Sequence, residues 1–129
     1  MSTQRKWALR VEHILDAIAK IQLYTSGLDE QSFAANSLVV DAVVRNLQVI
    51  GEAARQVPQD VQVQFPDVPW KLMMGTRHVI VHGYDVVRLD IIWQTVQVDL
   101  PPLVPRLLEV LDAVQRNDGA HPNVGKSEA

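Results

Sequence analysis

Residues 38–56 read LVVDAVVRNLQVIGEAARQ, and this stretch decides the fold class. Its apolar residues recur at steps of three and four, which places them along one side of an α-helix. They are Val39, Val43, Leu47, Ile50 and Ala54, with Val40, Val44 and Ala53 widening the stripe. Asn36 or Ser37 can cap the start of this helix, and Pro58 ends it. The wide apolar stripe predicts a helix in the core of a bundle.

Similar patterns lie on both sides of this segment. Residues 7–21 carry apolar side chains at helical spacing, and Ser26-Gly27 stops that helix. Asp29 can cap a short helical turn that follows, because its carboxylate accepts free amide hydrogens. A further helix begins near Pro69, where the fixed φ of proline does no harm, and runs to about His82. The sequence therefore predicts long helices before and after the central one.

The last apolar pattern runs from Leu89 to Val96 and resumes after Pro101-Pro102. One kinked helix and two separate helices fit it equally well. Between the helix of residues 38–56 and the helix that begins near Pro69, residues 58–69 contain three prolines and leave room only for a short helical piece. Strand-like alternation is confined to residues 61–65. The predicted fold class is all-α, a four- to five-helix bundle.

Length and composition restrict the function further. The 129 residues fit one helical domain, expected over residues 1–115, followed by a flexible tail over residues 116–129 that lacks apolar periodicity. A net charge of −3 argues against a protein that coats nucleic acid, but leaves room for a local basic site. The chain has no cysteine, which excludes disulfides and thiolate chemistry. No segment resembles a secretion signal or a membrane span, so a cytoplasmic location is expected.

Groups capable of catalysis gather in residues 77–84, which read RHVIVHGY. A turn of about 100° per residue puts His78 and His82 on one helix face, with Arg77 and Tyr84 on an adjoining one. Cleaving RNA without a metal needs a base for the 2′-hydroxyl, a cation beside the phosphate and a proton for the leaving oxygen. An arginine, two histidines and a phenol can meet these needs.

Other interpretations of these residues remain open. An isolated arginine or histidine on a helix is usually solvated or salt-bridged, and Tyr84 fits an ordinary half-buried aromatic. His78 and His82 also have the spacing of a two-histidine metal pair, as in a metal-bound hydrolase. No acidic third ligand lies at the matching helix position, because Asp85 follows Gly83. We therefore predict neither a metal nor a cofactor.

The same segment carries a family resemblance. Arg77, four intervening residues, His82, Gly83 and Tyr84 match the R-x4-H-x-Y motif of the HEPN ribonuclease toxins of the HepT type. The chain also resembles that family in its second helix, over residues 41–47 and 50–54, and at Pro69-Trp70, Gly75, Trp93 and Asp99-Leu100-Pro101. The resemblance covers roughly residues 5–115. The family often has asparagine directly after the motif arginine, where this chain has His78, a second titrating group.

The resemblance implies a specific function. By this resemblance, the protein looks like a metal-independent endoribonuclease toxin of a type II toxin–antitoxin system. Such enzymes cut RNA, with tRNA among their targets. The resemblance implies a HEPN-like symmetric homodimer in which two motifs face each other across a cleft, with Arg77 and His82 as catalytic residues. It also implies a partner, a minimal nucleotidyltransferase antitoxin of the MntA type, that attaches AMP to Tyr84 and neutralises the toxin.

Three residues of the second helix are expected to support the site: Arg45, Asn46 and Glu52. Arg45 and Glu52 are seven residues apart and share a helix face that could line the cleft. Alternatively, Glu52 only pairs with a nearby arginine inside the bundle. The basic residues of the first helix, Arg5, Lys6 and Arg10, could add a lip for RNA or simply form a solvated helix start.

A second function fits the same residues. A non-catalytic helical dimer could bind the minimal nucleotidyltransferase and serve as its AMP acceptor at Tyr84. Its support in the sequence is the acidic net charge and the unusual His78.

Overall fold

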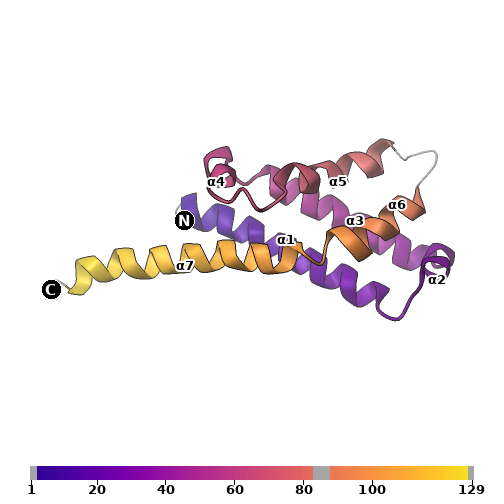
Figure 1. The fold of residues 1–129 in the computed structure, drawn as a ribbon, viewed down its shortest axis with the longest axis horizontal. Helices are drawn as coiled ribbons and strands as arrows, with labels where there is room; N and C mark the ends of the chain where they lie inside the picture. Colours follow the sequence, from indigo (N-terminus) through magenta and orange to yellow (C-terminus); the bar gives the residue numbers. More distant parts are fainter. Residues whose placement is uncertain (1–2, 83–87, 128–129) are drawn as a thin grey trace.

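Helix α3 (Ser37–Arg55) is the centre of the fold, with α1 (Thr3–Thr25) and α5 (Trp70–His82) packed against it (Figure 1). The computed structural model describes the backbone of residues 3–82 and 88–127 and the side chains of residues 3–76 and 88–116. Within these ranges the regular structure is entirely helical. The remaining elements are α2 (Glu30–Ala35), α4 (Gln59–Gln64), α6 (Leu89–Gln94), the π-helical turn η1 (Thr95–Asp99) and α7 (Leu103–Ser127). The predicted all-α bundle is confirmed.

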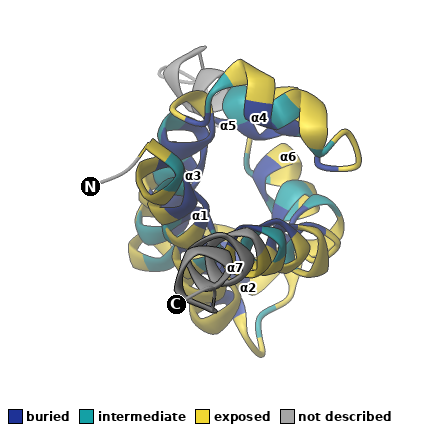
Figure 2. Ribbon diagram, turned by 90° about the vertical axis from the view of Figure 1, so that its left-hand side faces the viewer, coloured by how far each residue is buried: buried dark blue, intermediate teal, exposed yellow. Residues whose placement is uncertain are grey.

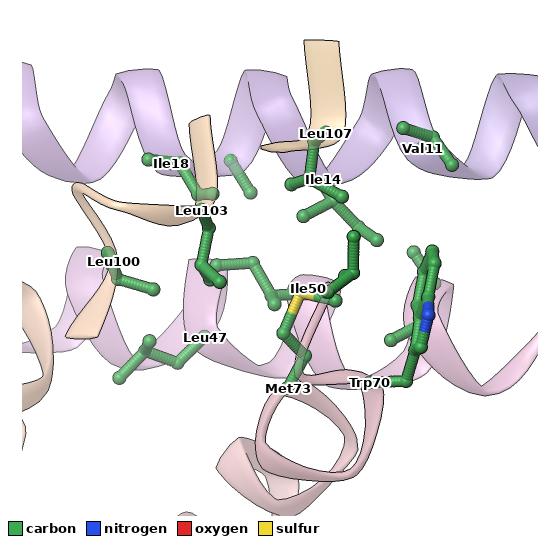
Figure 3. Close-up of a cluster of buried hydrophobic side chains, with 14 of the residues drawn as sticks. Val11, Ile14, Ile18, Leu47, Ile50, Trp70, Met73, Leu100, Leu103 and Leu107 are labelled. Atoms are coloured by element: carbon green, nitrogen blue, oxygen red, sulfur yellow. The ribbon is translucent and has the colours of Figure 1, made fainter. Parts of the chain in front are cut away.

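The core is built from one side of each long helix. Figure 2 shows the buried residues on the inward faces of the ribbons and the exposed residues outside. Ten of the buried side chains that meet in the centre are labelled in Figure 3: Val11, Ile14, Ile18, Leu47, Ile50, Trp70, Met73, Leu100, Leu103 and Leu107. Full burial of each such side chain contributes roughly 1.5–3 kcal/mol relative to exposure. Without disulfides, this packing is the main source of stability.

Local signals begin and end the first helices as the sequence predicts. Gly27 has a φ of 80°, a backbone conformation that glycine adopts without steric cost, and it turns the chain after α1. The Asp29 carboxylate accepts the Ser32 amide hydrogen at 2.8 Å, and the Ser32 hydroxyl accepts the Asp29 amide at 2.9 Å. The hydrogen bonds that the Ser32 amide and the Ser32 hydroxyl donate to this carboxylate lower the pKa of Asp29 below its usual value. Asn36 caps α3 by accepting the Val39 amide at 3.2 Å.

The carboxyl-terminal pattern resolves into two helices. Helix α6 continues into η1, whose last bond joins the Leu100 amide to the Thr95 carbonyl at 3.0 Å. Pro101 and Pro102 then separate this turn from α7, because proline has no amide hydrogen to extend the ladder. Helix α7 lies along α1 and extends past the amino terminus (Figure 1).

Helix α7 is longer than the sequence pattern suggests. Its backbone is helical through Ser127, whereas apolar periodicity is lost after residue 115. The last buried side chain within the described ranges is Val114. The division into a domain and a flexible tail stays a prediction. Among the described helices, none is long and apolar enough to cross a bilayer.

Candidate functional site

The motif of residues 77–84 begins on helix α5, which is continuous from Trp70 to His82. The side chains of Arg77, His78 and His82, and all of Tyr84, lie outside the described residues. The backbone still fixes the helix positions. Positions 77 and 82 are separated by about 7.5 Å along the axis and about 140° around it, whereas positions 78 and 82 differ by only about 40°.

Thr76 anchors the helix directly before this motif. Its side chain is buried, and its hydroxyl oxygen lies 2.9 Å from the Leu47 carbonyl and 2.7 Å from the Met73 carbonyl. The contact with Leu47 joins α5 to α3, because the two residues belong to different helices. The bond therefore fixes the level at which the motif begins along α3.

A groove of about 430 Å³ lies on the outer side of α1 and α3. We call it the α1/α3 groove; it is lined by Arg10, His13, Arg45, Gln48, Val49, Glu52, Ala53 and Gln56. Arg45 and Glu52 line it together, in agreement with their seven-residue spacing. Helix α1 contributes Arg10 and His13 to the lining. These residues are three positions apart and are therefore neighbours on the helix surface. His13 was not singled out from the sequence, although this spacing to Arg10 was a usable signal.

The charges in the α1/α3 groove are unequally neutralised. Glu52 lies 3.9 Å from Arg55, and both side chains are about half exposed, at 46% and 57%. This pair is on the surface of α3 and not in the interior of the bundle. Within the described part of the chain, neither Arg10 nor Arg45 makes an ion pair. The groove therefore presents two guanidinium groups and an imidazole to solvent.

Asn46 lies apart from this groove. Only 9% of its surface is exposed, and its amide nitrogen donates to the Ala42 carbonyl at 2.8 Å. This bond satisfies the buried side chain within its own helix. Asn46 is therefore placed to stabilise α3, while Arg45 beside it faces outward.

The described residues offer no cluster of three or more histidine, aspartate or glutamate side chains that could hold a metal. His78 and His82 fall outside that search, because their side chains are not among those described. The idea of a two-histidine metal pair therefore stays untested.

These features define a class of protein: an all-helical bundle that carries an arginine and a histidine five positions apart on one packed helix. The family model described as "Ribonuclease HepT-like" matches residues 14–110. The chain belongs to the HepT-like ribonuclease family.

Individual relatives agree with this assignment. A protein of Thermococcus cleftensis named "Probable ribonuclease HepT" is 33% identical over 72% of this chain and 84% of its own length. "Putative RNase TTE0752" of Caldanaerobacter subterraneus is 32% identical over 86% of this chain and 96% of its own length. A protein of Methanocaldococcus jannaschii named "Gamma-glutamylcyclotransferase and putative RNase MJ0434" is 30% identical over 88% of this chain, which spans about half (51%) of that protein. No solved structure matches significantly.

Proposed function

We propose that this protein is a metal-independent endoribonuclease that acts as the toxin of a type II toxin–antitoxin system. The observation that carries the proposal is the position of Arg77 and His82 on a continuous helix of a chain in the HepT-like ribonuclease family. Relatives whose names describe them as ribonucleases extend over most of this chain, which supports the same activity.

The chemistry requires three groups around one phosphodiester. A histidine takes the proton of the 2′-hydroxyl, and the freed oxygen attacks phosphorus. The bond from phosphorus to the 5′-oxygen breaks, and an acid returns a proton to that oxygen. Arg77 stabilises the additional negative charge on the phosphate. The products are a 2′,3′-cyclic phosphate and a 5′-hydroxyl, with His82 as the motif histidine and His78 as a second proton carrier.

A dimer supplies these groups more completely than one chain. Because positions 77 and 82 lie about 140° apart around α5, side chains leaving them start from different helix faces. Two copies related by a two-fold axis would place two arginines and two histidines around a shared cleft. This supports a site at the dimer interface, with Arg45 and Glu52 at its edge and Asn46 supporting the helix behind it.

The same site provides an off switch. A minimal nucleotidyltransferase antitoxin that transfers AMP to the Tyr84 hydroxyl would add bulk and negative charge beside Arg77. The added phosphate pairs with the arginine and repels an incoming RNA strand. Toxicity would then depend on the ratio of modified to unmodified chains.

The decisive experiment compares the wild-type protein with His82→Ala on a single-stranded RNA in the presence of a chelator. We expect the wild type to cut and the variant to lose at least about a hundredfold in rate, the usual contribution of a general acid or base. An RNA with a 2′-deoxy sugar at the cleaved position should resist the wild type, because it lacks the attacking hydroxyl. Equal cleavage by both proteins would refute the assignment of His82.

The outcome also separates the ribonuclease from the AMP acceptor. If unmodified wild-type protein cuts no RNA but accepts AMP at Tyr84 from the nucleotidyltransferase, the non-catalytic dimer is correct. Tyr84→Phe is the matched control, because it removes the acceptor oxygen and keeps the ring.

A further inference from the structure

We propose that the α1/α3 groove binds the phosphodiester backbone of the RNA strand that flanks the cleaved bond. The inference rests on the proposed ribonuclease function and adds a substrate class, a single strand longer than the cleaved step. With a volume of about 430 Å³, the groove has the size of a small-molecule pocket. It accepts part of one strand and not a duplex.

The charge of the groove fits a phosphate chain. Arg10 and Arg45 each offer a planar fork of donors that matches phosphate oxygens, and His13 of α1 lines the groove with them. Among the described lining residues Glu52 is the one carboxylate, and it lies beside Arg55, which offsets its charge. In a chain with a net charge of −3, this is a local basic surface. The amides of Gln48 and Gln56 add donors and acceptors suited to ribose or base edges.

The groove and the start of the motif lie at a similar level along α3. The hydrogen bond between Thr76 and the Leu47 carbonyl places the residue before Arg77 at the level of Leu47. Arg45 precedes Leu47 by two residues, which is about 3 Å along the axis of α3. Around the helix, positions 45 and 47 differ by about 160°, so a strand that leaves the motif at this level has to cross the surface of α3 to reach the Arg45 end of the groove.

Two other grooves have a different character. The groove between α1 and α7 combines Arg5 with Glu12 and with leucine side chains, so its charges oppose each other. The groove beside α4 contains Asp60, and its lining includes no basic side chain within the described ranges of the chain. A protein partner also fits the α1/α3 groove less well than RNA does, because Val49 and Ala53 are the only apolar side chains among the lining residues that the structure describes.

The test measures cleavage by the full-length protein on a long single-stranded RNA and on a dinucleotide that contains only the cleaved bond. The double variant Arg10→Ala/Arg45→Ala is compared with the wild type and with Lys20→Ala. Lys20 is exposed on α1 and does not line the groove, so its replacement removes a positive charge elsewhere on the same helix. Circular dichroism establishes that all three proteins are folded.

For the double variant we expect KM for the long RNA to rise about tenfold for each lost guanidinium, and KM for the dinucleotide, which is too short to reach the groove, to rise less. The slope of log KM against log salt should fall by about 0.7 for each lost phosphate contact, whereas Lys20→Ala keeps the wild-type slope. The variant Arg10→Lys/Arg45→Lys should recover part of the affinity, because it keeps the charge but loses the fork.

Three results would overturn the inference while leaving the proposed function intact. The first is a wild-type KM for the long RNA in the double variant, and the second is an equal loss on both substrates. The third is a double variant that binds RNA normally but no longer accepts AMP from the nucleotidyltransferase, which would assign the groove to that partner. If the wild type cuts neither RNA, the proposed function itself fails.

Discussion

The Thr76 hydroxyl connects the core of the bundle to the motif that follows it. The side chain is buried, and its hydroxyl lies within hydrogen-bonding distance of carbonyls on both α3 and α5. A hydroxyl has one proton to donate, so the two carbonyls share it. Because Arg77 is the next residue, an altered contact here would change the position of the motif on α3.

Replacing Thr76 by valine tests this role. Valine keeps the shape of threonine and removes the hydroxyl, so we expect the free energy of unfolding to fall by about 1 kcal/mol. Urea titration followed by circular dichroism measures this change. Thr76→Ser keeps the hydroxyl and is the matched control for the bond. A valine variant as stable as the wild type would mean that the bond to Leu47 contributes nothing net.

Individual residues differ in how far the sequence predicts them. Asp29 and Asn36 act within three residues of their own positions, so their capping roles were predictable. The pairing of Thr76 with Leu47 spans 29 residues and depends on how two helices pack, which no local pattern encodes. That His13 and Arg45 line one groove depends on helix packing in the same way, although the spacing of His13 to Arg10 was a local signal.

The apolar periodicity of the sequence predicts the existence of the helices well, and it predicts their first and last residues less accurately. Helices α1, α3 and α5 begin and end within a few residues of the predicted positions, because apolar spacing and caps agree there. The region after Arg88 was ambiguous, since proline excludes an uninterrupted helix but does not say how the chain resumes. The π-helical turn η1 shifts the register before Pro101, and buried Leu100 and Leu103 then lead into α7.

The length of α7 leads to a prediction about the carboxyl-terminal segment. Val114 is the last buried side chain that the structure describes, and residues after it contain Gly119 and Pro122, which oppose helix propagation. We expect a chain ending at Gln115 to unfold with a free energy within about 0.5 kcal/mol of the full-length value. Thermal and urea unfolding of the two chains measure this. A larger loss of stability would assign residues 116–129 to the folded domain.

At the scale of the whole molecule, the proposed site between two chains depends on which surfaces of the bundle one chain leaves uncovered. Helix α3 is covered by α1 on one side and by α5 on the other, so its inner face is already used by the core. The α1/α3 groove opens outward, and the motif begins level with its Arg45 end. Under the proposed function, a second copy packed across the motif would bring two motifs together in one cleft.

A mixture of two inactive variants tests whether that cleft is shared. Arg77→Ala and His82→Ala should each be inactive alone, and each should sediment as a dimer of twice the chain mass of 14.5 kDa. In a mixed dimer one arginine and one histidine remain around the same phosphate, so co-expression should restore part of the activity. At most about half of the dimers in an equal mixture are mixed, which sets the upper limit of the recovery. If the mixture stays inactive although mixed dimers form, each site takes its arginine and its histidine from one chain. Monomeric protein that still cuts RNA would remove the need for a shared cleft altogether.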